Sequence, residues 1–228
     1  MDRIGDSLQG KSVLITQSED FMGPALCEAF NAYGAEVISD ARPLAEPGVA
    51  EKLVADAGHV DVLIANLAVP APRTRVEEIG DEEWTHVFSH IVDPLPRLFR
   101  SVLPQMLERQ SGKIVVMGST SALRGIKGAA TYSAARGAQI SFVRTAGTEV
   151  ADRNVHINLI AQNYVENPTY YPPELQAMEK FQQRLKAEVP LGRLASAEED
   201  AQFAVFLAAS EVNFFVGQSF PFSGGWVT

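Results

Sequence analysis

Cysteine, positive charge and long apolar runs are all scarce in this sequence of 228 residues, and each scarcity excludes a class of protein. Cys27 is the single cysteine, so no disulfide can form within the chain, and a reducing cytoplasm is the expected compartment. The net charge is −9 with both signs interspersed, which leaves no basic surface for nucleic acid. No apolar run reaches the length of a bilayer-spanning helix, so we expect no membrane partner.

Glycine is missing where a dinucleotide site would need it. In α/β proteins that bind dinucleotides, the turn after the first strand carries three glycines, which let the pyrophosphate approach the start of a helix. Here the turn over 16–23 retains only Gly23. Glu19 and Asp20 place negative charge, and Phe21 places bulk, where the pyrophosphate would lie. We therefore predict chemistry that uses no nucleotide cofactor.

Strands and helices are expected to alternate along the chain. Short apolar runs predict strands over 12–16, 36–39, 60–65, 113–117, 155–160 and 218–222. Helical periodicity predicts helices after Gly23 and over 49–57, 84–109, 132–153 and 197–210, with prolines 94, 96 and 104 kinking or breaking the third of these. This order indicates a single-domain, Rossmann-like three-layer fold over 1–228, a parallel sheet with helices on both faces. One helix between the second and third strands predicts a sheet shortened after the second strand.

The segment over 164–194 departs from this alternation. Tyrosines and prolines crowd its first part, and a polar stretch predicts one helix over 174–189. Because α/β proteins bind ligands beyond the carboxyl ends of their strands, we expect an ordered excursion over the active site. The alternative is an ordinary surface connection.

Ser119, Tyr132 and Arg136 are the strongest candidates for catalysis. Ser119 follows a predicted central strand, while Tyr132 and Arg136 are four residues apart and share one face of a helix. A guanidinium close to a phenol favours the phenolate, which is a base for a hydroxyl proton. Lysine in place of Arg136 would indicate a nicotinamide-dependent reductase, so the three residues alone fit both reduction and a reaction without cofactor.

Metal chemistry has little support in the sequence. His59, His86, His90 and His156 are scattered, and the pair four residues apart, His86 and His90, has no third ligand nearby. We interpret that pair as part of the surface or of a subunit interface, and we expect no metal.

With these features the chain resembles the halohydrin dehalogenases, a family within the short-chain dehydrogenase/reductase superfamily, over nearly its full length. The superfamily likeness lies in residues 62–66, 102–106 and 223–225. The family likeness lies in Ser119, Tyr132 and Arg136, in the aromatic Phe21, and in residues 162–164 and 167–172. Two features depart from the family pattern: Gln162 stands where proline is usual, and the stretch after Asp40 is short.

The resemblance implies a cofactor-independent lyase that converts vicinal haloalcohols to epoxides and halide. In reverse, small anions such as azide, cyanide or nitrite would open epoxides. Tyr132 would be the base, Arg136 would hold it as the phenolate, and Ser119 would orient the substrate oxygen.

The same resemblance implies a halide site and a substrate pocket. The halide would lie in a nest of backbone amides beside the ring edge of Phe21, formed by Gln162, Asn163, Tyr164 and Val165. Tyr171 and Ser121 would line the substrate pocket, and the two long helices would build a homotetramer. Two alternatives stay open, an atypical NAD(P)-dependent short-chain oxidoreductase and a catalytically silent relative.

Overall fold

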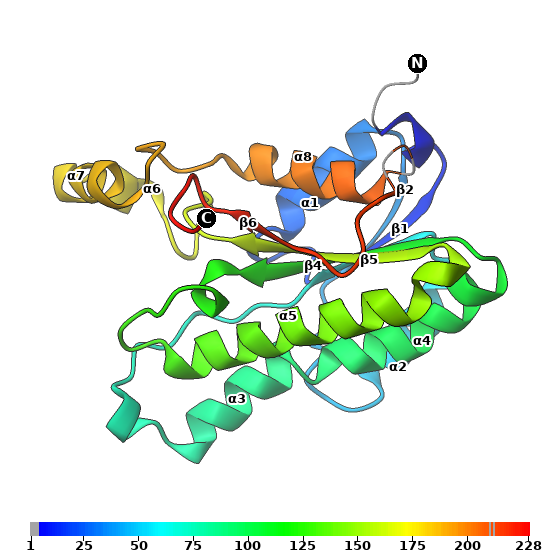
Figure 1. The fold of residues 1–228 in the computed structure, drawn as a ribbon, viewed down its shortest axis with the longest axis horizontal. Helices are drawn as coiled ribbons and strands as arrows, with labels where there is room; N and C mark the ends of the chain where they lie inside the picture. Colours follow the sequence, from blue (N-terminus) through cyan, green and yellow to red (C-terminus); the bar gives the residue numbers. More distant parts are fainter. Residues whose placement is uncertain (1–4, 210, 212) are drawn as a thin grey trace.

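Six parallel strands form one sheet at the centre of the computed structural model, which describes residues 5–209, 211 and 213–228 (Figure 1). The strands lie in the order β2-β1-β3-β4-β5-β6, and every neighbouring pair is parallel. They are β1 (Ser12–Thr16), β2 (Glu36–Asp40), β3 (Val62–Asn66), β4 (Gly112–Ser119), β5 (Val155–Gln162) and β6 (Ser219–Phe222). The Rossmann-like α/β fold predicted from the sequence is confirmed.

Helices cover both faces of this sheet. One face carries α1 (Gly23–Ala32) and α8 (Ala197–Ala208), which pack on each other (Figure 1). The opposite face carries α2 (Val49–Ala57), α3 (Asp81–Ile91), α4 (Pro94–Glu108) and α5 (Ala130–Val150). Within the described ranges, no helix combines the length and the apolar composition needed to cross a bilayer.

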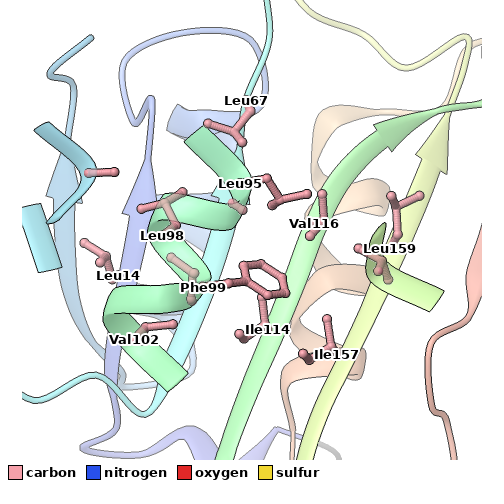
Figure 2. Packing of buried hydrophobic residues seen from close by; sticks show 14 of the residues in the cluster. Leu14, Leu67, Leu95, Leu98, Phe99, Val102, Ile114, Val116, Ile157 and Leu159 are labelled. Atoms are coloured by element: carbon pink, nitrogen blue, oxygen red, sulfur yellow. The ribbon is translucent and has the colours of Figure 1, made fainter. Parts of the chain in front are cut away.

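The central strands are apolar on both sides because both sides are covered. In β4, Ile114 and Val116 belong to the core beneath α4, whereas Val115 and Met117 belong to the core beneath α8. Figure 2 shows the ring of Phe99 projecting from α4 onto β4. The alternation fixes the register of the strands, because a slip by one residue would exchange the two cores.

Proline placement explains where the long predicted helix breaks. The helix expected over 84–109 is two helices, α3 and α4, which are separated just before Pro94. Pro94 and Pro96 lie in the first turn of α4, where backbone N–H groups have no partner within the helix. Pro104 lies inside α4, so it does not break the helix.

Two other helices differ from the sequence prediction. The single helix predicted over 174–189 is wrong, because the structure has α6 (Pro173–Gln176) and then α7 (Glu179–Glu188). Met178 is extended between them, and α7 is oriented to bury Phe181 and Leu185. The helix predicted over 197–210 ends at Ala208, and Ser210 lies outside the described residues.

The order of the strands creates the place where a ligand can bind. The chain passes from β1 out to the edge strand β2, and α2 then carries it back past β1 to β3. The carboxyl ends of β1 and β3 therefore flank a switch point, the usual ligand site of an open parallel sheet. Figure 1 shows α6 and α7 projecting beyond the sheet at the end where β4 and β5 finish.

Replacing Gly23 by alanine is expected to destabilise the protein by about 3 kcal/mol, because α1 starts against the preceding turn. A Cβ at Gly23 would lie 2.6 Å from the carbonyl oxygen of Ser18 and would also overlap the carbonyl of Gln17. Urea unfolding measures the loss. Gly80→Ala is the control, because a Cβ there meets no atom within 4 Å. Alanine is a poorer N-cap of α3 than glycine but restricts the unfolded chain, so stability should change by less than about 1 kcal/mol. Equal effects of the two substitutions would contradict the close approach.

Candidate active site

A cavity of about 120 Å³ opens at the carboxyl ends of β1, β3, β4 and β5. Its lining is contributed by the turn after β1, by the strand ends, by the start of α5 and by the loop after β5. All of the residues assigned to the site from the sequence line it: Phe21, Ser119, Ser121, Tyr132, Arg136, Gln162, Asn163, Tyr164, Val165 and Tyr171. The fold thus brings the predicted catalytic, halide and substrate residues into one place.

Tyr132 and Arg136 form a buried pair on the first turns of α5. Arg136 donates from Nη2 to the hydroxyl of Tyr132 over 3.0 Å, and its guanidinium lies 5.0 Å from the centre of the tyrosine ring. Tyr132 is 7% exposed and Arg136 is 3% exposed. The guanidinium is thus held against the phenol oxygen with little access of water to either group.

The remaining bonds of Arg136 all go to neutral acceptors. Nη1 donates to the carbonyl of Leu67 at 2.9 Å, to that of Met117 at 3.0 Å, and to the side chain of Gln139 at 2.9 Å. Among the described residues, no carboxylate is bonded to this buried cation. An anion at Tyr132 or in the cavity beside it would supply the missing negative charge.

Ser119 is the last residue of β4 and lies beside Gln162 of β5 in the sheet register. Its Oγ accepts a hydrogen bond from the backbone N–H of Ser121 at 3.2 Å, which leaves its own proton to donate. The Oγ of Ser121 is buried and has no hydrogen-bond partner in the described part of the chain. Two serine hydroxyls therefore face the cavity with a donor to offer.

Several backbone amides of the turn after β1 donate hydrogen bonds within the protein. The backbone N–H groups of Ser18, Asp20 and Gly23 donate to the carbonyls of Asp40, Gln17 and Asp20, respectively. The side chain of Gln17 also spans to Ala68, accepting from its N–H at 2.7 Å and donating to its carbonyl at 2.8 Å. The amides of Ser18, Asp20 and Gly23 are thus used inside the protein, which leaves fewer N–H groups of this turn for a pyrophosphate.

Two residues of the predicted halide site have strained backbones. Phe21 has φ of 51° and Tyr164 has φ of 56°, both in the left-handed region that side chains other than glycine rarely adopt. Each such residue costs about 1 kcal/mol or more, a cost typical of ligand sites. The ring of Phe21 lies 5.8 Å from that of Tyr170, which holds it at the cavity wall.

The loop after β5 offers fewer free amides than the sequence suggested. Asn163 donates its backbone N–H to the carbonyl of Phe222 at 3.0 Å, and Gln162 is still part of the sheet. Tyr164 donates its N–H only to the adjacent side chain of Asn163 at 2.9 Å. The left-handed conformation of Tyr164 is one that anion-binding nests use to bring successive N–H groups together, here its own and that of Val165. Of the four residues expected to hold an anion, only Tyr164 and Val165 have backbone N–H groups that other backbone groups do not use, among the hydrogen bonds of the described residues.

Gln162 has a partner that the sequence did not indicate. Its side-chain Nε2 donates to Oδ2 of Asp200, a residue of α8 that is completely buried. Burial raises the pKa of Asp200 from its ordinary 3.8 to about 7, against a smaller lowering by the Gln162 amide. The other oxygen, Oδ1, has no hydrogen-bond partner among the described residues. A carboxyl group that titrates near neutrality thus lies directly behind the loop.

The unfolding free energy should depend on pH through Asp200. The folded protein keeps the Asp200 proton up to about pH 7, whereas the unfolded chain loses it near 3.8, so stability should fall as pH rises between these values and then level off. The loss is up to about 4 kcal/mol, since one pKa unit corresponds to about 1.4 kcal/mol. Urea unfolding over this range should show the stability of Asp200→Asn rising relative to that of the parent protein as pH rises. A difference in unfolding free energy that stays constant with pH would contradict the raised pKa of Asp200.

Tyrosines of the excursion close the cavity from above. Tyr170 accepts from the N–H of Ala71 and donates to the carbonyl of Val69, each at 3.0 Å. Burial raises its pKa, and the nearby Tyr132 raises it further. Tyr171 donates to Asn163 at 3.4 Å, and burial raises its pKa to about 12. Both phenols therefore stay protonated at neutral pH and act as hydrogen-bond donors.

The cavity also has lining residues that the sequence did not indicate. They are Met22, Asn66, Ala68, Ala71, Arg73, Met117, Gly118, Ile126, Ala129, Asn167 and Tyr170. Asn66 carried a signal, a polar residue ending an otherwise apolar strand.

Metal-ligating side chains do not gather in the described part of the chain, where no three histidine, cysteine or acidic residues are grouped for an ion. His86 and His90 face each other along α3, with ring centres 4.3 Å apart. His90 Nδ1 lies 2.7 Å from the carbonyl of His86. The pair lies outside the cavity lining.

Comparison with known proteins shows which family the chain belongs to. Residues 45–227 match the family model described as enoyl-(acyl carrier protein) reductase. The 3-oxoacyl-(acyl carrier protein) reductase of Thermotoga maritima is 31% identical over 180 residues, which cover 78% of this chain and 71% of the relative. The chain belongs to the short-chain dehydrogenase/reductase superfamily. The corresponding reductase of Escherichia coli K12 is 28% identical over 245 residues, covering 96% of this chain and 98% of the relative.

Two solved structures share the fold of this chain over nearly its full length. One, described as a dehalogenation enzyme, has a TM-score of 0.90 and 30% identity, and the match covers 97% of this chain and 100% of that protein. Another is the L-sorbose reductase of Gluconobacter frateurii with NADPH and L-sorbose, with a TM-score of 0.86, 24% identity, and coverage of 96% and 97%. The second match supports the fold alone. The proteins similar to this chain in sequence thus include a dehalogenation enzyme and 3-oxoacyl-(acyl carrier protein) reductases.

Proposed function

We propose that the protein is a cofactor-independent halohydrin dehalogenase, which converts vicinal haloalcohols to epoxides and halide. The observation that carries the proposal is the buried Tyr132–Arg136 pair, a base and a cation without a carboxylate partner in the described chain. The hydrogen bonding within the turn after β1 and the likeness to a dehalogenation enzyme at 30% identity support it.

The proposed reaction begins with a proton transfer. The phenolate of Tyr132, held by Arg136, removes the proton of the substrate hydroxyl, while Ser119 donates a hydrogen bond to the same oxygen. The alkoxide attacks the neighbouring carbon from the side opposite the halogen. A carbon–oxygen bond forms as the carbon–halogen bond breaks, and the halide leaves with the electron pair. Tyr132 then returns its proton to solvent.

The leaving halide has a place in the same cavity. In the proposal, the N–H groups of Tyr164 and Val165 point at the anion, and the ring edge of Phe21 presents its positive rim. Tyr164 must exchange its bond to the Asn163 side chain for one to the halide, a replacement of one acceptor by another. Because the step is reversible, azide, cyanide or nitrite bound there would open an epoxide.

The substrate in this proposal is small. Ser121, Tyr170 and Tyr171 surround the cavity with hydroxyl groups, and its volume of about 120 Å³ favours short haloalcohols.

We extend the proposal to a cytoplasmic homotetramer built through α3, α4 and α5, for which Trp84, 45% exposed on α3, is a candidate contact.

Bromide release from a short vicinal bromoalcohol, with no nucleotide added, tests the proposed function. We expect release to follow protein concentration and to be accompanied by an equal amount of epoxide. Azide added to the epoxide should give an azidoalcohol by the reverse reaction. Absence of halide release across a panel of short chloro- and bromoalcohols would reject the proposal and favour the catalytically silent alternative.

A second candidate function is supported by the sequence relatives, which are reductases of 3-oxoacyl-(acyl carrier protein). If the protein were such a reductase, it would bind NAD(H) or NADP(H) although several amides of the turn after β1 are hydrogen bonded within the protein. Fluorescence titration with both reduced nucleotides distinguishes the two functions. We expect no binding in the micromolar range, and nucleotide binding with nucleotide-dependent ketone reduction would favour the reductase.

A further inference from the structure

Asp200 is an unusual residue to find buried at the start of a helix packed on a sheet. It is 0% exposed and lies in the first turn of α8, after the exposed Glu198 and Glu199. Its Oδ2 accepts from Nε2 of Gln162, and its Oδ1 has no hydrogen-bond partner in the described residues. An isolated buried carboxylate is costly, and such a group is retained in its neutral form or where its charge has a use.

Gln162 connects Asp200 to the cavity. It is the last residue of β5 and one of the cavity-lining residues, and its carbonyl accepts from Oγ1 of Thr120 at 3.3 Å. The residues that follow it in the chain form the loop proposed to hold the halide. The Asp200 carboxyl is thus one side chain away from the backbone that would bind an anion.

Other charged groups on the surrounding elements do not compensate Asp200. On α1, which packs against α8, Glu28 is exposed. On β4 and β5, Lys113 and His156 lie at the opposite ends of the strands. On α8 itself, the exposed Glu199 is paired with Arg193 at 2.7 Å. The influences on its ionisation are burial and the Gln162 amide.

We propose that Asp200 is a positioning residue that controls the affinity of the halide site through its own proton, with the anion held when the carboxyl is neutral and released when it ionises. The inference rests on the proposed function, because it concerns the same halide site. With Asp200 neutral, the carboxylate bonded to this loop is that of Glu188, which accepts from the Tyr164 hydroxyl and is itself paired with Arg184 at 3.0 Å. With Asp200 ionised, its charge repels the anion through a medium that screens poorly. Thermodynamic linkage requires that anion binding in turn favours the neutral carboxyl, so binding should be accompanied by uptake of a proton at Asp200.

The expected pH dependence follows from the ionisation of Asp200. Its pKa of about 7 places the change near neutral pH. Chloride affinity should be highest below this pH and about tenfold lower above it, the effect of a coupling equal to one pKa unit. Product halide would therefore leave more readily from the ionised form.

Chloride binding, measured by chlorine NMR line broadening at constant ionic strength, tests the inference without any turnover. The parent protein should bind chloride about tenfold more weakly at about pH 8.5 than at about pH 6. Asp200→Asn keeps an acceptor for Gln162 but carries no charge, so it should bind with nearly constant affinity at both values. Glu198→Gln is the matched control, which removes an exposed charge from the same helix and should retain the parent's dependence.

The outcomes separate the inference from the proposed function. Chloride binding that does not change with pH in the parent, or a parent-like dependence in Asp200→Asn, would overturn the role of Asp200 and leave the dehalogenase proposal intact. No chloride binding at any pH would count against the halide site and against both. If Asp200→Asn does not fold, chloride affinity can still be measured against pH in the parent and in Glu198→Gln. An affinity that does not change with pH in the parent rejects the inference.

Discussion

Tyr132→Phe is expected to lower halide release from a vicinal haloalcohol by about 10³-fold, the largest effect we predict. The substitution removes one oxygen atom and with it the base that takes the hydroxyl proton. It leaves the ring in its place among Val69, Val87 and Ile91. Halide release without nucleotide, followed at a series of substrate concentrations, should show the loss in kcat, because proton removal belongs to the transition state.

Tyr33→Phe is the control for this prediction. The hydroxyl of Tyr33 donates to the side chain of Gln202 at 2.8 Å, on the face of the sheet that carries α1 and α8, and Tyr33 is not among the cavity-lining residues. The same chemical change there should leave halide release within about twofold of the parent, as for a surface substitution. Activity retained in Tyr132→Phe would remove the proposed base, and an equal loss in Tyr33→Phe would indicate damage to the fold.

Arg136→Lys should be the second most damaging substitution, lowering kcat/KM by about 10²-fold and stability by about 3 kcal/mol. Arg136 reaches four acceptors at once, the carbonyls after β3 and within β4, the Gln139 side chain, and Tyr132. A lysine ammonium is a single point of charge on a flexible stem and cannot span them. Halide release and urea unfolding measure the two losses.

Arg144→Lys, on the same helix at an exposed position, is the matched control and should change neither quantity appreciably. The arginine substitution also distinguishes the two candidate functions. In the reductase alternative, lysine at position 136 is the residue expected from the spacing with Tyr132, so nucleotide-dependent reduction should survive or increase. Halide release unaffected by Arg136→Lys would contradict the role of Arg136 in the proposed dehalogenase.

The sequence predicted the sheet well because its central strands, β3, β4 and β5, are buried on both sides. Residues 62–65 of β3, for example, form an uninterrupted apolar run, which is typical of a parallel sheet covered on both faces. Helix ends were less predictable. The break at Met178 depends on how Phe181 and Leu185 meet Tyr164 and Val189, a contact between distant segments that local periodicity does not contain.

The candidate site was predictable as a set of residues but not as a set of bonds. Spacing placed Tyr132 and Arg136 on one helix face, and the structure has them hydrogen bonded. Spacing did not indicate that the amide of Asn163 is used by Phe222, because that bond joins β5 to the last strand. Asp200 was also missed, since it follows two glutamates and resembles a solvated helix start. Its helical spacing to Ala204 and Leu207, both buried, was the available signal.

The bridge from Gln17 to Ala68 determines how this scaffold can be redesigned. One side chain fastens the turn after β1 to the loop after β3 through two hydrogen bonds, and the Asn66 side chain donates to the carbonyls of Gln17 and Asp20. Phe21→Gly alone would remove the ring but would leave these fastenings and the inward-turned amides in place. In the proposed dehalogenase, introducing a nucleotide site would therefore require exchange of the loop between β1 and α1, since its hydrogen bonds come from Gln17, from Asn66 and from the backbone of the turn.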